Sequence, residues 1–125
     1  TGCEAVSRVT TDDSDMAVGK WSDGRIGSYR GMRVGKMSYG GTAFGSKADA
    51  SVGDYNGYEP LVEEIVKFFR SGEVPVPAEE TIEIFAFMSA ADESKSQGGK
   101  PVLVRPMIED AYAKAKERLK GLNAN

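Results

Sequence analysis

The sequence predicts an α+β protein in which an open-faced, mainly antiparallel sheet of about five strands is followed by two to three helices packed on one face. Short alternating runs of polar and apolar residues, broken by turn residues, fill the first half, and most of the 15 glycines precede residue 58. Apolar residues at helical spacing dominate the second half. We expect one domain over residues 1–125, with the sheet at about 3–53 and the helical part at about 57–121.

Turn signals separate the predicted strands. The sequence Thr11-Asp12-Asp13-Ser14 and the dipeptide Asp23-Gly24 are typical of hairpin turns. The predicted strands are Glu4–Thr10, Met16–Trp21, Arg25–Arg33, Lys36–Phe44 and Lys47–Val52. In the third of them, alternation places Ile26, Ser28, Arg30 and Met32 on one face and Gly27, Tyr29, Gly31 and Arg33 on the other.

The helical half begins with an amphipathic segment at Tyr58–Arg70. Its apolar stripe is Leu61, Val62, Ile65, Val66 and Phe69. Gly72 stands where a left-handed residue ends a helix. Later in the chain, Val102–Val104 is a candidate short strand, and Pro106 opens a third helix that reaches about Lys120.

The second predicted helix, from about Ala78 to Gln97, is apolar on nearly all sides. Such a helix has to be covered from more than one direction. It is either a central core helix or a docking surface for a further domain. Full burial of Phe85 and Phe87 in a monomer would exclude the docking surface.

Composition excludes several classes of function. The net charge of −3 argues against a dedicated nucleic-acid binder, and the longest apolar stretch, Ile82–Ala91, is far shorter than a membrane span of about 20 residues. Without histidine there is no Ser-His-Asp triad, no Cys-His pair and no imidazole metal ligand. The single Cys3 excludes an internal disulfide. We therefore assign no catalytic, cofactor-binding or metal-binding residue.

Several clusters suggest chemistry but have simpler structural interpretations. The glycines of Gly35–Gly45 match no phosphate-binding loop, and Cys3 has no neighbouring base. Asp12, Asp13 and Asp15 are interpreted as solvated residues of a hairpin turn. Glu79, Glu80 and Glu83 are interpreted as surface charges that are favourable to the helix dipole. The basic tail is interpreted as a solvated helix face (Lys114, Lys116, Arg118, Lys120).

Aromatic residues offer a further alternative. A sugar-stacking face on the sheet could be formed by Trp21, Tyr29, Tyr39 and Tyr55. Half-buried aromatic residues are nevertheless common in strands, and packing is the favoured interpretation.

Three stretches carry a resemblance to a known family. The run from Gly57 to Val102 strongly resembles the end of the glucose–fructose oxidoreductase / inositol dehydrogenase / MocA family (Gfo/Idh/MocA), closest to a bacterial branch of it. Its most specific part is E-E-T-I-E-I-F-A-F-M-S-A-A-D-E-S-K, at 79–95. In the first half, W-S-D-G-R-I-G-S-Y-R-G and G-G-T-A-F-G-S-K resemble the sheet of that family. The resemblance covers about Cys3 to Val104, and the sequence after Pro106 departs from it.

The resemblance implies the C-terminal domain of an NAD(P)-dependent oxidoreductase acting on a sugar or polyol-like substrate. Family members bind NAD(P) in an N-terminal Rossmann domain, and their C-terminal sheet helps to form oligomers and the substrate site. The family's G-x-G-x-x-G, Glu-Lys-Pro and Asp-x-x-x-His motifs match nothing here, so no catalytic residue is carried over.

The resemblance also sets the expected partners. These are an N-terminal Rossmann domain, a small-molecule substrate and further copies joined through the sheet face, with neither nucleic acid nor membrane. The start at Thr1-Gly2-Cys3 suggests a fragment whose leader, and hence its compartment, would be encoded upstream. We expect the chain alone to be inert. The alternative is a non-enzymatic binding or assembly module that shares the fold.

Overall fold

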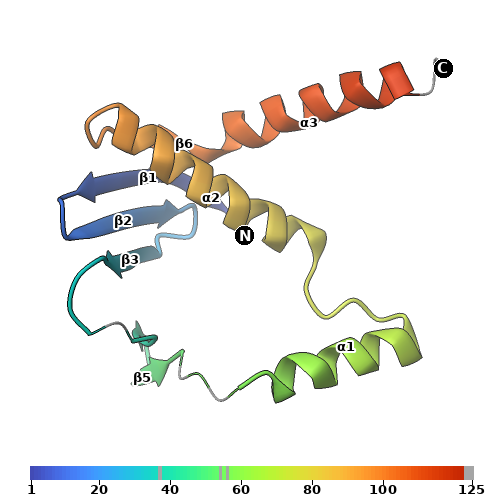
Figure 1. Ribbon diagram of the computed structural model, residues 1–125, viewed down its shortest axis with the longest axis horizontal. Helices are drawn as coiled ribbons and strands as arrows, with labels where there is room; N and C mark the ends of the chain where they lie inside the picture. The colour runs from blue at the N-terminus through green and yellow to red at the C-terminus, as the bar shows by residue number, and fades with distance from the viewer. Residues whose placement is uncertain (37, 54, 56, 123–125) are drawn as a thin grey trace. The chain divides into compact units, whose positions relative to one another are not determined.

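The computed structural model describes residues 1–36, 38–53, 55 and 57–122. The chain forms two compact units, one made of Thr1–Arg33 with Pro77–Asn125 and the other of Val34–Val76 (Figure 1). Strands come first and helices dominate the second half, which confirms the α+β class.

The first unit contains a four-stranded antiparallel sheet. Its strands are β1 (Cys3–Thr10), β2 (Ser14–Trp21), β3 (Ile26–Met32) and β6 (Val102–Leu103), in the order β3-β2-β1-β6. A tight turn joins β1 to β2, in which the Thr11 N–H donates to the Ser14 carbonyl at 2.8 Å. The predicted strand at Val102–Val104 is confirmed for Val102 and Leu103, which form one edge of this sheet, whereas Val104 already belongs to the following helix.

The pairing register defines two faces of the sheet. One face, covered by helix, includes Val6, Arg8, Asp15, Ala17, Gly19, Gly27, Tyr29 and Gly31. The opposite face, which we call the open face, includes Val9, Met16, Val18, Lys20, Ile26, Ser28, Arg30 and Leu103. The face assignment predicted for the third strand is therefore confirmed.

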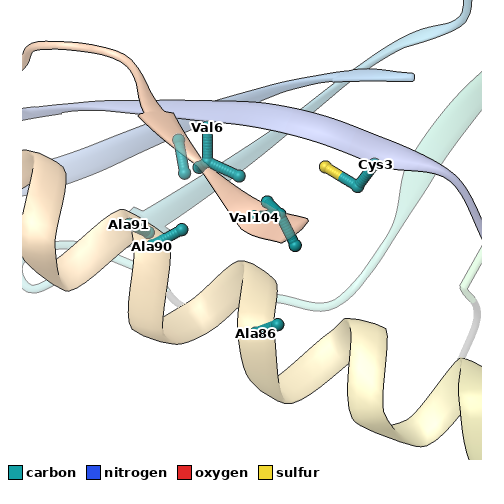
Figure 2. Close-up of a cluster of buried hydrophobic side chains, with 7 residues drawn as sticks. Cys3, Val6, Ala86, Ala90, Ala91 and Val104 are labelled. Carbon is teal, nitrogen blue, oxygen red and sulfur yellow. The ribbon is translucent and has the colours of Figure 1, made fainter. Parts of the chain in front are cut away.

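Helix α2 (Ala78–Ser96) packs on the covered face, chiefly over β1 (Figure 1). It buries the small residues Ala86, Ala90 and Ala91 against Val6 and Val104 (Figure 2). Alanine at these positions lets the helix backbone approach the strand closely. The core is accordingly small and depends on close contact more than on bulky side chains.

A hydrogen bond fixes the C-terminal part of α2 to the sheet. The Ser94 side chain is completely buried, and its hydroxyl accepts a hydrogen bond from the Arg8 N–H at 2.9 Å. β6 pairs with Ala5 and Val6 of β1 and does not reach Arg8. The Ser94 hydroxyl therefore supplies the hydrogen-bond acceptor that β6 cannot offer to the Arg8 N–H.

Helix α2 packs against the sheet and against α3 (Val104–Leu122), and the rest of its surface is exposed. Ile84, Phe85 and Met88 are exposed, Phe85 to 63% of its surface, and Phe87 is partly buried. The interpretation as a core helix is therefore confirmed for the side that carries Ala86, Ala90 and Ala91. The interpretation as a docking surface remains a prediction for the side that carries Ile84, Phe85 and Met88.

Helix α3 (Val104–Leu122) follows β6 directly. It starts two residues before the predicted position, and Pro106 lies in its first turn. Val104 is buried and Met107 and Ile108 are partly buried, whereas the helix is exposed from Glu109 onward. The interpretation of its basic residues as a solvated face is confirmed. None of the described helices is long and apolar enough to cross a membrane.

The second unit holds a two-stranded sheet and one helix. The strands β4 (Gly41–Phe44) and β5 (Asp49–Val52) pair with each other and do not extend the larger sheet. The predicted strand Lys36–Phe44 is shortened to β4, because Gly40 adopts a positive φ of 151° and ends the extended backbone there. Met37, within the predicted strand, lies outside the described residues. Helix α1 (Glu59–Ser71) ends at Gly72, whose φ of 72° confirms the predicted left-handed residue.

Truncation of Val6 tests the core. Val6→Ala removes two methyl groups that are 1% exposed, and we expect it to lower the free energy of unfolding by about 2 kcal/mol. The control is Val74→Ala, which removes the same atoms from a side chain that is 61% exposed and lies on neither the sheet nor a helix, and it is expected to cost less than about 0.5 kcal/mol. Urea unfolding followed by circular dichroism measures both; equal losses would contradict this core.

Candidate functional site

A groove lies on the covered face of the sheet, between α2 and the strands β2 and β3. It exists because α2 lies chiefly over β1 and leaves the inner face of β3 uncovered. Its volume is about 860 Å³, within the range of small-molecule sites. The apolar part of the lining comes from Ala17, Gly27, Tyr29, Ile84, Phe87 and Met88. We call this the α2 groove.

Trp21 lies at one end of the α2 groove. Its ring stacks on Phe87 with a centroid distance of 6.1 Å and an interplanar angle of 20°, and the Arg25 guanidinium lies 5.9 Å from the indole centroid. A Cβ at Gly19 would stand 2.6 Å from Phe87 and 2.8 Å from Trp21, so the glycine makes room for both rings. Packing therefore accounts for Trp21.

Glu83 joins this end of the groove to the start of β1. Its carboxylate accepts hydrogen bonds from the Trp21 indole N–H at 3.2 Å, from the Cys3 N–H at 3.1 Å and from the Gly2 N–H. Partial burial raises the pKa of Glu83, but these hydrogen bonds outweigh it and hold the pKa below its ordinary value. The interpretation of Glu83 as dipole-compensating surface charge is wrong, because the Glu83 side chain points toward the sheet and binds groups of β1 and β2.

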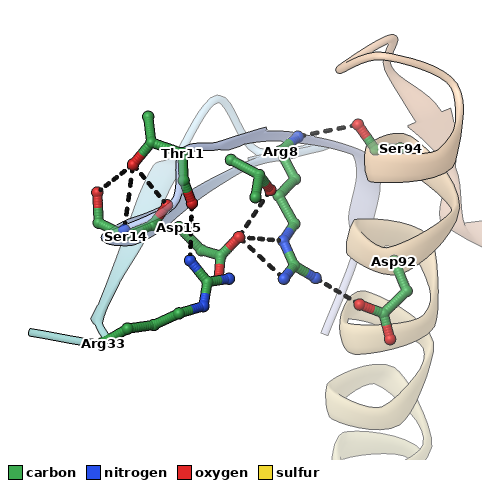
Figure 3. A network of polar contacts seen from close by, with 8 residues as sticks. Arg8, Thr11, Ser14, Asp15, Arg33, Asp92 and Ser94 are labelled. Atoms are coloured by element: carbon green, nitrogen blue, oxygen red, sulfur yellow. Dashed lines mark hydrogen bonds and ion pairs between the residues drawn. The ribbon is translucent and has the colours of Figure 1, made fainter.

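A cluster of charged residues closes the other end of the groove (Figure 3). Asp15 accepts hydrogen bonds from the Thr10 hydroxyl at 2.6 Å and from Arg8 Nε at 3.0 Å, and it also pairs with Arg33. Arg8 in turn pairs with Asp92 on α2. The Thr10 hydrogen bond lowers the pKa of Asp15 against the effect of desolvation, and the two arginines lower it further.

The structure corrects the interpretation of Asp15 as part of a solvated turn. Thr11–Ser14 form the turn, whereas Asp15 is the second residue of β2 and points to the covered face. Strand alternation could have revealed this, because Asp15, Ala17 and Gly19 share one face. The sequence contains no comparable local signal for the contact with Asp92, which is distant in the chain.

The groove contains charges that neutralise one another and one exposed phenol, that of Tyr29. Cys3 does not supply a nucleophile, because the thiol is buried and burial raises its pKa. Within residues 1–36, 38–53, 55 and 57–122, no three acidic or cysteine side chains are grouped to hold a metal ion. The arrangement is suited to holding a ligand against an apolar surface.

The four aromatic residues of the predicted sugar-stacking face do not share one sheet face. Trp21 and Tyr29 both line the α2 groove. Tyr39 and Tyr55 belong to the second unit, where their ring centroids are 6.4 Å apart and Tyr55 also contacts Tyr58 at 5.7 Å. Trp21 and Tyr29 therefore belong to the groove, and Tyr39 and Tyr55 belong to an aromatic cluster within the second unit.

Comparisons with protein family models, with curated proteins and with solved structures find no match to this chain.

The environment of Glu83 predicts a pH dependence. Because its pKa is lower in the folded state, its ionised form stabilises the fold above the unfolded pKa of about 4.3, and this stabilisation is lost as pH falls through the folded pKa. We expect Glu83→Gln to cost about 1–2 kcal/mol at neutral pH and to lose less stability on acidification than the parent chain.

Urea unfolding between pH 7 and pH 3 measures this effect. The control is Glu79→Gln, on the exposed first turn of the same helix, which should retain the acid dependence of the parent. An unchanged acid dependence in Glu83→Gln would contradict the role of the carboxylate.

Proposed function

We propose that this chain is the C-terminal, substrate-side and assembly domain of an NAD(P)-dependent oxidoreductase that acts on a sugar or polyol-like substrate. A Rossmann domain elsewhere in the parent protein would bind the nicotinamide and supply the catalytic residues. The family assignment is supported by the resemblance of 79–95 and of the two sheet motifs to the Gfo/Idh/MocA family. The open-faced sheet is the architecture that this resemblance implies.

One observation carries the assembly part of the proposal. Helix α2 packs on one side of the sheet, and the open face presents apolar side chains to solvent, including Val9, Met16, Val18 and Ile26, which are 39–75% exposed. Arg30 lies among them, and methionine and arginine are enriched in protein interfaces. A second copy packed on this face would remove these apolar groups from water.

The α2 groove supports the substrate part of the proposal. In the parent enzyme it would form one wall of the substrate site, with Tyr29 as an exposed hydrogen-bonding group on an apolar floor. The hydride transfer itself would take place on the nicotinamide in the other domain.

A specific observation favours the alternative, a non-enzymatic binding or assembly module. The charges that meet the groove, Arg8, Asp15, Arg33 and Asp92, are bound to one another. They then hold α2 on the sheet, and the groove would recognise a ligand through its apolar lining and the Tyr29 hydroxyl. The reading frame before Thr1 separates the two: G-x-G-x-x-G and Glu-Lys-Pro motifs support the enzyme, and their absence supports the module.

Sedimentation equilibrium tests the open face. Val18→Lys places a charge at the centre of that face, and we expect the dissociation constant for self-association to rise at least about tenfold because the ammonium would have to lose its hydration. The control is Thr42→Lys, which adds the same charge to an exposed strand of the second unit. An average mass for Val18→Lys equal to that of the parent and the control would contradict the interface.

Coenzyme turnover tests whether the catalytic residues lie in another domain of the parent protein. The purified 125-residue chain, mixed with NADH or NADPH and a panel of keto sugars, should leave the absorbance of the reduced nicotinamide unchanged. Oxidation above the rate of a blank without protein would contradict the proposal that the catalytic residues lie in another domain.

A further inference from the structure

Helix α1 presents an apolar stripe to solvent over its whole length. Its large apolar side chains are 38–79% exposed, and none of its residues is buried. The stripe is two residues wide and consists of Leu61 and Val62, Ile65 and Val66, and Phe68 and Phe69. A stripe of this width is typical of a helix that packs against another element.

Charged residues follow one edge of this stripe, with Glu59 and Arg70 at its opposite ends and Glu63 one turn after Glu59. Glu59 is in the first turn and Arg70 in the last. They are eleven residues apart, which is close to three helical turns, so both lie on the edge formed by Val66. They are about 16 Å apart along the axis and cannot pair with each other. The remaining cation, Lys67, pairs with Glu64 of its own helix at 2.5 Å.

We propose that α1 pairs with α1 of a second copy as an antiparallel helix pair about a two-fold axis. In this arrangement Glu59 of each copy meets Arg70 of the other, so the ion pair forms twice. A parallel pair would instead place the acidic ends side by side. Antiparallel helix dipoles add to the preference.

Side-chain size supports the same orientation. The larger residues, Phe68 and Phe69, lie at the C-terminal end of the stripe, and the smaller Leu61 and Val62 lie at the N-terminal end. Antiparallel pairing packs each phenylalanine pair against the smaller pair of the other copy, so large groups meet small ones. The surface is therefore complementary to itself in both charge and volume.

This contact is independent of the proposed function. The open face belongs to the first unit, whereas α1 belongs to the second. The antiparallel pair would be a separate self-association surface, and either interface can fail without the other.

A charge exchange tests the helix pair in the full chain. Glu59→Lys and Arg70→Glu are made as two single variants, each in the parent and in the Val18→Lys background. In each variant alone, like charges meet, and we expect the dissociation constant of the α1 contact to rise at least about tenfold. In an equimolar mixture of the two, opposite charges meet at both ends, and association should return as a mixed dimer of differently tagged chains.

Lys116→Glu is the control, because it makes the same charge change as Arg70→Glu on an exposed part of α3. Circular dichroism of each variant checks that α1 stays helical. Restored association in the mixture, weakening as salt is added, supports the pair. Either of two results overturns it: single variants that associate like Lys116→Glu, or a mixture that associates no better than its components. The Val18→Lys background shows separately whether the open face contributes.

Discussion

The close contact between α2 and β1 is the interaction on which the rest of the first unit depends. Ala86, Ala90 and Ala91 allow the helix to lie near the strand, and Ser94 joins the two by a buried hydrogen bond. A helix held this tightly over β1 leaves the inner face of β3 uncovered. The α2 groove is therefore a consequence of the position of the helix.

Polar contacts then fix the two ends of the groove. Glu83 connects α2 to the start of β1 and to Trp21, and Arg8 connects β1 to Asp15 and to α2 through Asp92. Both carboxylates on the covered side of the sheet, Glu83 of α2 and Asp15 of β2, have lowered pKa values because hydrogen-bond donors surround them. The fold thus uses its ionised side chains to position the helix on the sheet.

Local patterns in the sequence predicted most of the secondary structure. Alternation placed the faces of β3, and Gly72 marked the end of α1, because both follow from neighbouring residues. The division of the six described strands between two sheets was not predictable, since pairing depends on contacts between distant residues. The same limit explains why the hydrogen bonds of Glu83 could not be predicted, because its partners Gly2, Cys3 and Trp21 are far away in the chain.

We have proposed that further copies of the chain cover the open face and the apolar stripe of α1, which lie outside the α2–β1 core. Amide hydrogen exchange at increasing protein concentration tests this most directly. If further copies cover these surfaces, the N–H groups that join β1 to β2 are strongly protected already at the highest dilution, whereas protection in α1 and β3 is low there and rises strongly with concentration. Protection of α1 that is already complete at the highest dilution, and does not change with concentration, would contradict it.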